Sequence, residues 1–301
     1  MLVYGISMVR NEADIIRLNV LYHLSLGVDR LHVVDNGSTD GTDEALQRLS
    51  AEYAEVRWSR DDGSFLPSRV MTSLARQAFK EGADWVVPID ADEFWYAPGG
   101  DFRGVLEESN AAVLRAQAIN FIQRRGQRES KPDALLHMTM RVASPVGPPD
   151  RGQDLVEAQQ IAFVEKVYPQ KCISRPTAEI YIETGHHSIS GVDGPRKRTD
   201  EVVCLHAPMR SRAALGERVR SSKRAAEAGR NLRQGRNRRR LMELEGQAAI
   251  DLEWAANSYE DDHLDVYGER HAVVFDPRLR DAVSPFISRP FWKRLLGPLR
   301  R

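Results

Sequence analysis

The chain has 301 residues, which is enough for one or two domains, and its 42% hydrophobic and 29% charged residues are typical of a folded globular protein. Lys+Arg 43 balance Asp+Glu 43, so the zero formal charge excludes a global electrostatic attraction to nucleic acid or anionic lipid. Two cysteines exclude a disulfide framework, and no apolar run is long enough for a membrane span. Because the first residues also lack a secretory signal pattern, we expect a cytoplasmic protein.

Short apolar runs alternate with amphipathic stretches over the first hundred residues. The pattern predicts strands over 2–8, 31–34, 56–58 and 85–89, with helices between Asn11 and Gly27, from Thr42 onward, and over 67–80. Strands that alternate with helices in this way indicate a parallel α/β sheet.

The pattern changes from about residue 111 onward. Longer strands are predicted over 111–123 and 134–142, a loop over 144–152, and short strands over 161–167, 178–182 and 202–205. Helices follow from Ser211. We therefore predict an α/β domain over residues 1–210, with a mostly parallel mixed sheet flanked by helices, and a mainly helical C-terminal region over 211–301.

Two predicted strands end in acidic residues. Asp35 ends the second strand, and Asp90 and Asp92 end the fourth. Ligands of open parallel sheets bind beyond the carboxyl ends of the strands, so these side chains are expected at one edge. Mg²⁺ and Mn²⁺ prefer such oxygen ligands and leave positions open for phosphate. The alternative interpretation is an ordinary solvated strand end.

The segment 35–42 (DNGSTDGT) forms the second signal. It exposes backbone N–H groups at the start of a helix, where anionic or polar ligand groups bind favourably. Asp35 can also accept hydrogen bonds from a nucleobase or ribose. Alone, the segment is equally an Asx-rich turn with a helix cap. Together with residues 10–12 at the end of the first strand, it indicates a nucleotide pocket.

Four segments carry a family resemblance: 8–12 (MVRNE), 22–28 (YHLSLGV), 35–42 and 84–94 (DWVVPIDADEF). They resemble family 2 glycosyltransferases of the GT-A fold, in the branch with the motifs NE…H..LGV…DN.S.D and D.DEF. The resemblance covers residues 1–100 and continues weakly to about 225 through 205–211 (LHAPMRS). It implies a GT-A-like fold and a nucleotide-diphosphate sugar as donor, with a UDP-sugar expected.

The resemblance implies a role for each matching residue. Asp35 contacts the base or ribose, Asp90 and Asp92 hold Mn²⁺ or Mg²⁺ with the diphosphate, and His206 completes the metal shell. The remaining residues expected to bind the donor are Met8, Arg10, Asn11, Glu12, Asn36, Arg69, Ala91 and Arg210. The sequence departs from the family at Met8, where Pro is usual, and at Asn36, where Asp is common.

The expected reaction is displacement at an anomeric carbon, with a nucleoside diphosphate as leaving group and a glycan or lipid-linked hydroxyl as acceptor. An inverting route needs a carboxylate base near that hydroxyl. The candidate bases are Glu93, Asp154, Glu157 and Glu183. Asp92, the second carboxylate of the DxD motif, is also expected to be catalytic. His187 is either an acceptor-side or phosphate-side group or an ordinary packed histidine.

Charge runs leave other functions open. Residues 210–240 carry twelve Lys or Arg and two Glu, and residues 241–270 carry nine Asp or Glu and one Arg. The basic run indicates either nucleic-acid binding or a helix face paired with the acidic run. The tail, residues 284–301, mixes aromatic residues with arginines and is a candidate for peripheral contact with the inner membrane surface.

Three alternatives to glycosyl transfer remain. A sugar-nucleotide nucleotidyltransferase would need a Gly-rich basic loop after the first strand, which residues 7–12 lack. A phosphatase with a DxD motif would carry that motif at the first strand rather than the fourth. A non-catalytic nucleic-acid-binding protein would rely on the Arg-rich run and would show steep salt dependence.

Overall fold

A computed structural model of the chain describes residues 1–301 except 64–65, 127–132, 148–154, 157, 228–235 and 288–301. The chain divides into two compact units. The first unit comprises residues 1–118, 169–205 and 285–301, and the second comprises 119–168 and 206–284. The chain thus passes between the units several times, which differs from the single predicted boundary at residue 210.

An eight-stranded sheet forms the centre of the first unit, in the order β3-β2-β1-β4-β9-β6-β12-β5. The strands β3, β2, β1 and β4 run parallel, and β9 pairs antiparallel with both β4 and β6. Their bounds are β1 (Val3–Val9), β2 (Arg30–Asp35), β3 (Val56–Arg60), β4 (Trp85–Pro88), β5 (Glu93–Tyr96), β6 (Val113–Asn120), β9 (Lys171–Ser174) and β12 (Arg196–His206). The last two residues of β6 and the last of β12 are assigned to the second unit.

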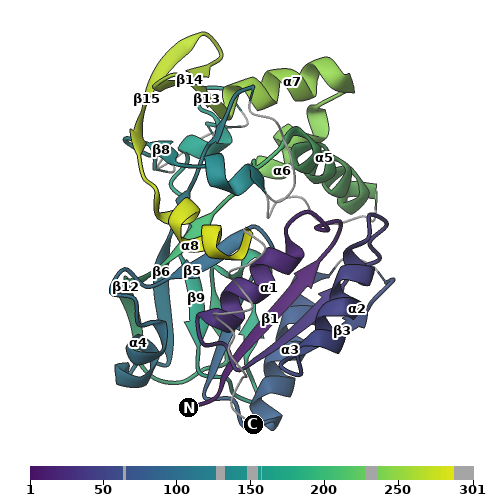
Figure 1. The fold of residues 1–301 in the computed structure, drawn as a ribbon, viewed down its shortest axis with the longest axis vertical. Coiled ribbons are helices and arrows are strands. Elements are labelled where there is room, and N and C mark those ends of the chain that lie inside the picture. The colour runs from purple at the N-terminus through teal and green to yellow at the C-terminus, as the bar shows by residue number, and fades with distance from the viewer. Residues whose placement is uncertain (64–65, 127–132, 148–154, 157, 228–235, 288–301) are drawn as a thin grey trace. The chain divides into compact units, whose positions relative to one another are not determined.

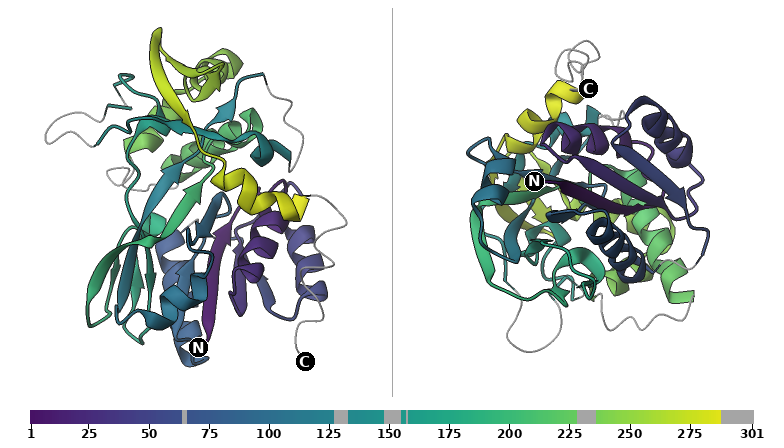
Figure 2. Two further views of the ribbon diagram at one scale, coloured as in Figure 1. Left: turned by 60° about the vertical axis from the view of Figure 1, so that its left-hand side comes forward. Right: turned by 90° about the horizontal axis from the view of Figure 1, so that it is seen from below.

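Helices cover both faces of the parallel strands. These are α1 (Ile16–Ser25), α2 (Thr42–Glu52) and α3 (Pro67–Lys80), followed by α4 (Phe102–Glu108). Figure 2 (right) shows α1 and α3 on opposite sides of β1. Every residue of β1 is buried, as expected for a parallel strand covered on both faces, and alternate residues of β1 (Tyr4, Ile6, Met8) share an apolar cluster with α3. The predicted fold class, a mixed sheet flanked by helices, is confirmed.

A smaller element completes the first unit. The strands β10 (Tyr181–Ile182) and β11 (Ile189–Ser190) form an antiparallel pair, and a 3-10 turn over Thr184–His186 lies between them. Ile182 and Ile189 join the same apolar cluster as α3.

The second unit contains a five-stranded sheet with the order β7-β13-β14-β15-β8. Its strands are β7 (Gln123–Arg124), β8 (Met140–Val142), β13 (Ser258–Glu260), β14 (His263–Val266) and β15 (Glu269–Phe275) (Figure 1). The helices α5 (Arg212–Glu227), α6 (Arg236–Glu243) and α7 (Gly246–Ala256) share one core with this sheet, and α8 (Arg278–Ile287) follows β15.

Two strand predictions in this unit are wrong. Residues 134–142 form a 3-10 turn over Asp133–His137 and only the short β8, and residues 161–167 form a 3-10 turn over Phe163–Glu165. Both runs are apolar because they enter the core, and burial alone does not distinguish a strand from a tight turn. The region after residue 211, predicted as mainly helical, also contains β13, β14 and β15.

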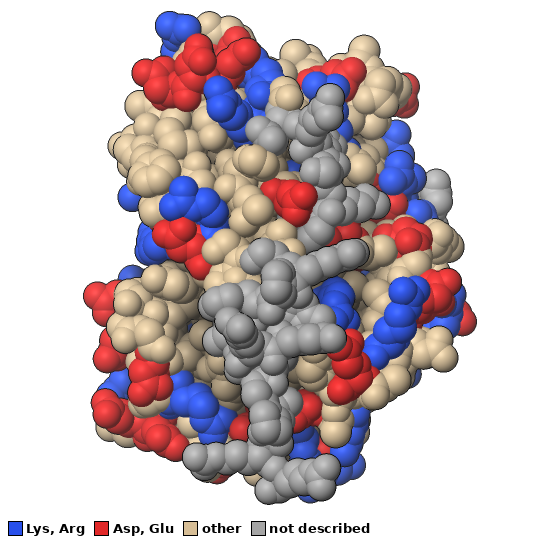
Figure 3. Space-filling view, viewed as in Figure 1, with Lys and Arg blue, Asp and Glu red and all other residues tan. Residues whose placement is uncertain are grey.

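On the face drawn in Figure 3, Lys and Arg lie interspersed with Asp and Glu. In the second unit, basic side chains of α5 and α6 pair with carboxylates: Arg212 with Asp251 at 3.5 Å, Arg224 with Glu217 at 2.6 Å, and Arg240 with Glu253 at 3.1 Å. These pairs favour the interpretation of the basic run as a paired helix face. Among the described residues, no helix combines the length and hydropathy that a membrane crossing requires.

Candidate active site

The strand register brings the two acidic strand ends to one edge of the sheet. β1 lies between β2 and β4, with Val9 opposite Asp35 and Ile6 opposite Pro88. The amide of Ile89 continues this ladder by donating to the carbonyl of Ile6 at 2.9 Å. Asp35, the last residue of β2, and Asp90, which follows Ile89, therefore lie at the same edge of the sheet. They are two strand spacings, or about 10 Å, apart.

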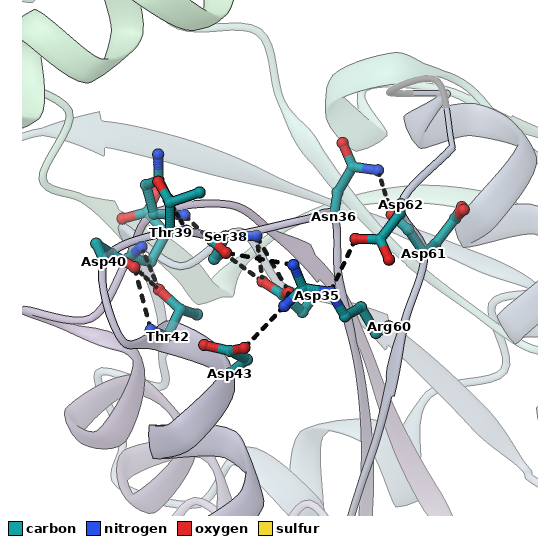
Figure 4. A network of polar contacts seen from close by, with 12 residues as sticks. Asp35, Asn36, Ser38, Thr39, Asp40, Thr42, Asp43, Arg60, Asp61 and Asp62 are labelled. Atoms are coloured by element: carbon teal, nitrogen blue, oxygen red, sulfur yellow. Dashed lines mark hydrogen bonds and ion pairs between the residues drawn. The ribbon is translucent and has the colours of Figure 1, made fainter.

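Asp35 is held inside the turn that follows β2 (Figure 4). Its carboxylate is fully buried, accepts from the amide and hydroxyl of Ser38, and lies 3.4 Å from Arg60 Nη1. Arg60 also pairs with Asp43 at 2.7 Å and with Asp62 at 2.8 Å. One guanidinium group thus contacts three carboxylates beside this edge.

Segment 10–12 is tied to the same turn. The amide of Asn11 donates to Ser38 Oγ at 2.9 Å, and the Asn11 side chain accepts from the amide of Thr39 at 2.8 Å. The amide of Glu12 donates to Thr42 Oγ1 at 2.8 Å. The expected nucleotide-binding segments, far apart in the sequence, therefore form one connected surface.

Two buried polar atoms in these segments have no hydrogen-bond partner among the described residues. They are Arg10 Nε and Asn36 Oδ1. The amide group of Asn36 is fixed, because its Nδ2 donates to the carbonyl of Asp61 at 2.8 Å. A buried acceptor of this kind is costly unless a ligand or water satisfies it, so Asn36 is suited to contact a polar ligand.

Helix α1 holds the turn over residues 90–93, hereafter the acidic turn. Asn19 Nδ2 donates to the carbonyls of Ala91 at 3.0 Å and Glu93 at 2.8 Å. Tyr22 donates its hydroxyl to the carbonyl of Trp95 at 2.6 Å, and His23 Nε2 accepts from the Trp95 amide at 3.3 Å. Because residues i, i+3 and i+4 share one face of a helix, a single helix face fixes the backbone of the motif.

Lys171, the first residue of β9, places an ammonium group among the acidic side chains. Its Nζ lies 2.5 Å from Glu93 Oε1 and 3.1 Å from Asp90 Oδ2, and it donates to the carbonyl of Gly185 at 2.8 Å. Lys171 and Glu93 are each 1% exposed, whereas the Asp90 side chain keeps 37% exposure. Asp90 therefore opens toward solvent while Glu93 faces the interior.

Burial and neighbouring charges shift the pKa values of these groups in different directions. Burial alone would raise the pKa of Asp90, but the neighbouring Lys171 and His186 lower it to about 2. Burial dominates at Glu93 and raises its pKa to about 8 against the effect of Lys171. Burial lowers the pKa of His186 to about 4 and, together with Lys171, that of His187 to about 4. At neutral pH, Asp90 is the ionised carboxylate and both histidines are neutral.

Other residues expected in the site have these positions. Met8 lies in the apolar cluster of the first unit, Asp92 is 8% exposed and Ala91 is 6% exposed. Arg69 is exposed on α3, and Glu183 is exposed beside the 184–186 turn. His187 Nδ1 lies 3.2 Å from the carbonyl of Gln170. Asp154 and Glu157 lie outside the described residues.

His206 and Arg210 belong to the second unit. His206 Nδ1 lies 2.8 Å from Asn120 Oδ1, and its ring contacts Tyr168. Arg210 is 4% exposed and its carbonyl accepts from Gln123. Their expected roles toward metal and diphosphate stay predictions.

Sequence reasoning missed Lys171 and Asn19. Lys171 opens the run Lys171–Ser174, which is only four residues long and was not predicted as a strand. A lysine beside two apolar residues was the only local signal. Asn19 is a buried polar residue within an apolar helix face, and that mismatch is itself a signal for a specific hydrogen-bonding role.

One family model matches a segment within the first 110 residues of the chain. Residues 7–110 match the model of glycosyl transferase family 2. A glycosyltransferase family 92 protein of Arabidopsis thaliana is 36% identical over 117 residues, which are 38% of this chain and 19% of that protein. One from Oryza sativa subsp. japonica is 32% identical over 98 residues, covering 31% and 16%. The chain thus matches less than a fifth of the length of these relatives.

Solved structures are similar at low sequence identity. The mannosyltransferase PcManGT from Pyrobaculum calidifontis, in complex with GDP-Man and Mn²⁺, is 16% identical with a TM-score of 0.41, covering 94% of this chain and 72% of that one. S. aureus TarS 1–349, in complex with UDP-GlcNAc, is 12% identical with a TM-score of 0.42, covering 85% and 71%. The match of residues 7–110 to the family 2 model confirms the resemblance identified from the motifs.

Proposed function

We propose that the protein transfers a sugar from a nucleoside-diphosphate sugar to a hydroxyl group of a glycan or lipid-linked acceptor. The observation that carries this proposal is the convergence of Asp35 and Asp90 at one edge of the parallel strands, two strand spacings apart. A nucleoside at the β2 end and a diphosphate at the β4 end fit that separation. The family 2 match over residues 7–110 supports the reaction class.

The nucleoside would bind along segment 10–12 and the turn after β2. Asn36 Oδ1 and Arg10 Nε are the buried polar atoms suited to meet it. Asp35 acts mainly by holding this turn, because Ser38 and Arg60 already engage its carboxylate. A UDP-sugar is the donor we test first.

A Mg²⁺ or Mn²⁺ ion fits the oxygen donors of the acidic turn, since Asp90 is ionised and open to solvent. Asp90 and Asp92 would hold it. The ion would neutralise charge on the departing diphosphate.

The base that deprotonates the acceptor hydroxyl must be accessible to it. Glu93 is 1% exposed and paired with Lys171, so we assign it to positioning the motif rather than to proton abstraction. Glu183 is exposed beside the turn whose Gly185 carbonyl contacts Lys171, and we propose it as the base to test first.

The test is a donor screen that measures release of nucleoside diphosphate from UDP-, GDP- and dTDP-sugars with and without Mn²⁺. Asp92→Asn should abolish turnover, and the exposed Asp193→Asn serves as the matched control and should keep it. Turnover that is equal in Asp92→Asn and the wild-type protein would refute the proposal. So would turnover of no donor by a protein that is folded by circular dichroism.

A further inference from the structure

A second set of possible metal ligands lies at the acidic turn, in addition to the Asp90–Asp92 pair. One ligand atom each of Asp90, Glu93 and His186 lie within 4.8 Å of one another, a spacing that suits a divalent cation. His186 is 3% exposed, its Nδ1 is buried with no hydrogen-bond partner in the described chain, and this atom lies 3.8 Å from Asp90 Oδ2. The histidine nitrogen is thus directed at the carboxylates.

The Lys171 ammonium lies among these same groups. It lies 2.5 Å from an oxygen of the Glu93 carboxyl group and 3.1 Å from an oxygen of the Asp90 carboxylate, and it donates to a third oxygen, the Gly185 carbonyl, at 2.8 Å. A protonated amine with three oxygen neighbours has the charge and the surroundings of a bound cation. With 1% exposure it is also shielded from exchange with dissolved ions.

We propose that Lys171 is a built-in cation of the acidic turn. Its ammonium fixes the Asp90 carboxylate and the Glu93 carboxyl group and closes the Asp90–Glu93–His186 position to divalent ions. Lys171 is therefore a positioning residue. It restricts any functional ion to the outer side of the motif, where Asp90 is exposed and Asp92 follows it.

The strand pairing explains why a lysine can serve here. β9 pairs antiparallel with β4, so Lys171 enters the sheet next to the strand that leads into Asp90. The ammonium is carried by the chain at a fixed position, and it needs no free ion to be present. Removal of this charge leaves the Asp90 carboxylate and the Glu93 carboxyl group close together with a neutral histidine beside them. Once Mn²⁺ displaces the proton of Glu93, these groups supply oxygen and imidazole donors that Mn²⁺ accepts.

The test measures thermal unfolding with and without 1 mM MnCl₂, and Mn²⁺ binding by isothermal titration calorimetry. The variants are Lys171→Met, Lys171→Arg, and the double variant Lys171→Met with His186→Ala. The exposed Lys197→Met is the matched control. Lys171→Met should bind one Mn²⁺ more than the wild-type protein, and Mn²⁺ should raise its Tm by ~3 °C beyond the wild-type shift.

The other variants should follow the wild-type protein. Lys171→Arg and Lys197→Met should bind no additional Mn²⁺. The double variant should bind the additional Mn²⁺ at least tenfold more weakly than Lys171→Met does. If Lys171→Met folds only when Mn²⁺ is present, the ion replaces the ammonium and the proposal holds. An Mn²⁺ stoichiometry and Tm shift equal to wild type, or a protein that remains unfolded with Mn²⁺ as without it, would overturn the proposal. These outcomes do not depend on sugar transfer, so they separate this inference from the proposed function.

Discussion

His23 should make the protein sensitive to acid through the contacts that hold the acidic turn. The imidazole is fully buried, with Nδ1 2.8 Å from the Asn19 carbonyl and Nε2 accepting from the Trp95 amide at 3.3 Å. This pair of contacts assigns the proton to Nδ1 and requires a neutral ring. Protonation of Nε2 would remove the bond to Trp95 and place an unpaired charge in the core.

The magnitude follows from the pKa. Burial lowers the pKa of His23 to about 4, from the ordinary value of 6.5. Because the folded-state pKa lies below the unfolded one, the neutral ring stabilises the protein above pH 6.5, and this contribution is lost as the pH falls toward 4. The full difference corresponds to about 3 kcal/mol, of which about 2–3 kcal/mol is lost between pH 7.5 and 4.5.

Urea unfolding of the wild-type protein, His23→Gln and Tyr22→Phe at pH 7.5 and 4.5 measures this contribution. Tyr22→Phe is the control, because it removes the neighbouring bond to the Trp95 carbonyl without removing a group that titrates in this range. The free energy of unfolding of His23→Gln should fall by about 2–3 kcal/mol less than that of the wild type over this interval, whereas Tyr22→Phe should fall as much as the wild type. Equal losses in His23→Gln and the wild type would show that the reasoning is wrong.

Three further outcomes are expected. Asn19→Ala removes the donor shared by the carbonyls of the acidic turn and should lower the free energy of unfolding by about 2–3 kcal/mol in urea titrations; an unchanged midpoint would contradict this. Gly185→Ala should lower the Tm by several degrees in scanning calorimetry, because Gly185 has φ +78° and a Cβ there would lie 2.8 Å from His187 Nε2; Gly99→Ala, where the space is open, should leave the Tm unchanged. The pKa of Glu93 is raised to about 8, so its contribution to stability is fully present below pH 4.5 and is lost as the pH rises through 8. The wild-type Tm should therefore fall between pH 7 and 9 more than the Tm of Glu93→Gln. Parallel pH profiles of the two proteins would argue against a buried neutral carboxyl.

The first hundred residues could be predicted closely from the sequence. The predicted helix over 67–80 has the bounds of α3, and the four predicted strands coincide with β1 to β4 within two residues at each end. Parallel strands covered by helices have strong periodic patterns and clear stops, and the convergence of Asp35 with Asp90 follows from strand direction alone.

The inner side of the site could not be predicted because it depends on pairings between distant segments. Lys171 and Asp90 are 81 residues apart in the sequence, and they meet only because β9 pairs with β4. A four-residue strand such as β9 has no periodicity that reveals its partner. The cation beside Asp35 could not be predicted from the sequence either. Arg60 reaches it from the end of the neighbouring β3, and nothing in the turn sequence itself indicates that a cation arrives from there.

The division of the chain affects the order in which the site can be completed during synthesis. The first 118 residues contain the whole family 2 match, yet β9 and β12 of the same sheet are translated only after residue 168. Until β9 emerges from the ribosome, Asp90 and Glu93 have no ammonium beside them and β4 has an unpaired edge. A nascent chain that has passed the matched region therefore holds an incomplete sheet, and a fragment ending at residue 118 should need a chaperone or an added cation to remain soluble.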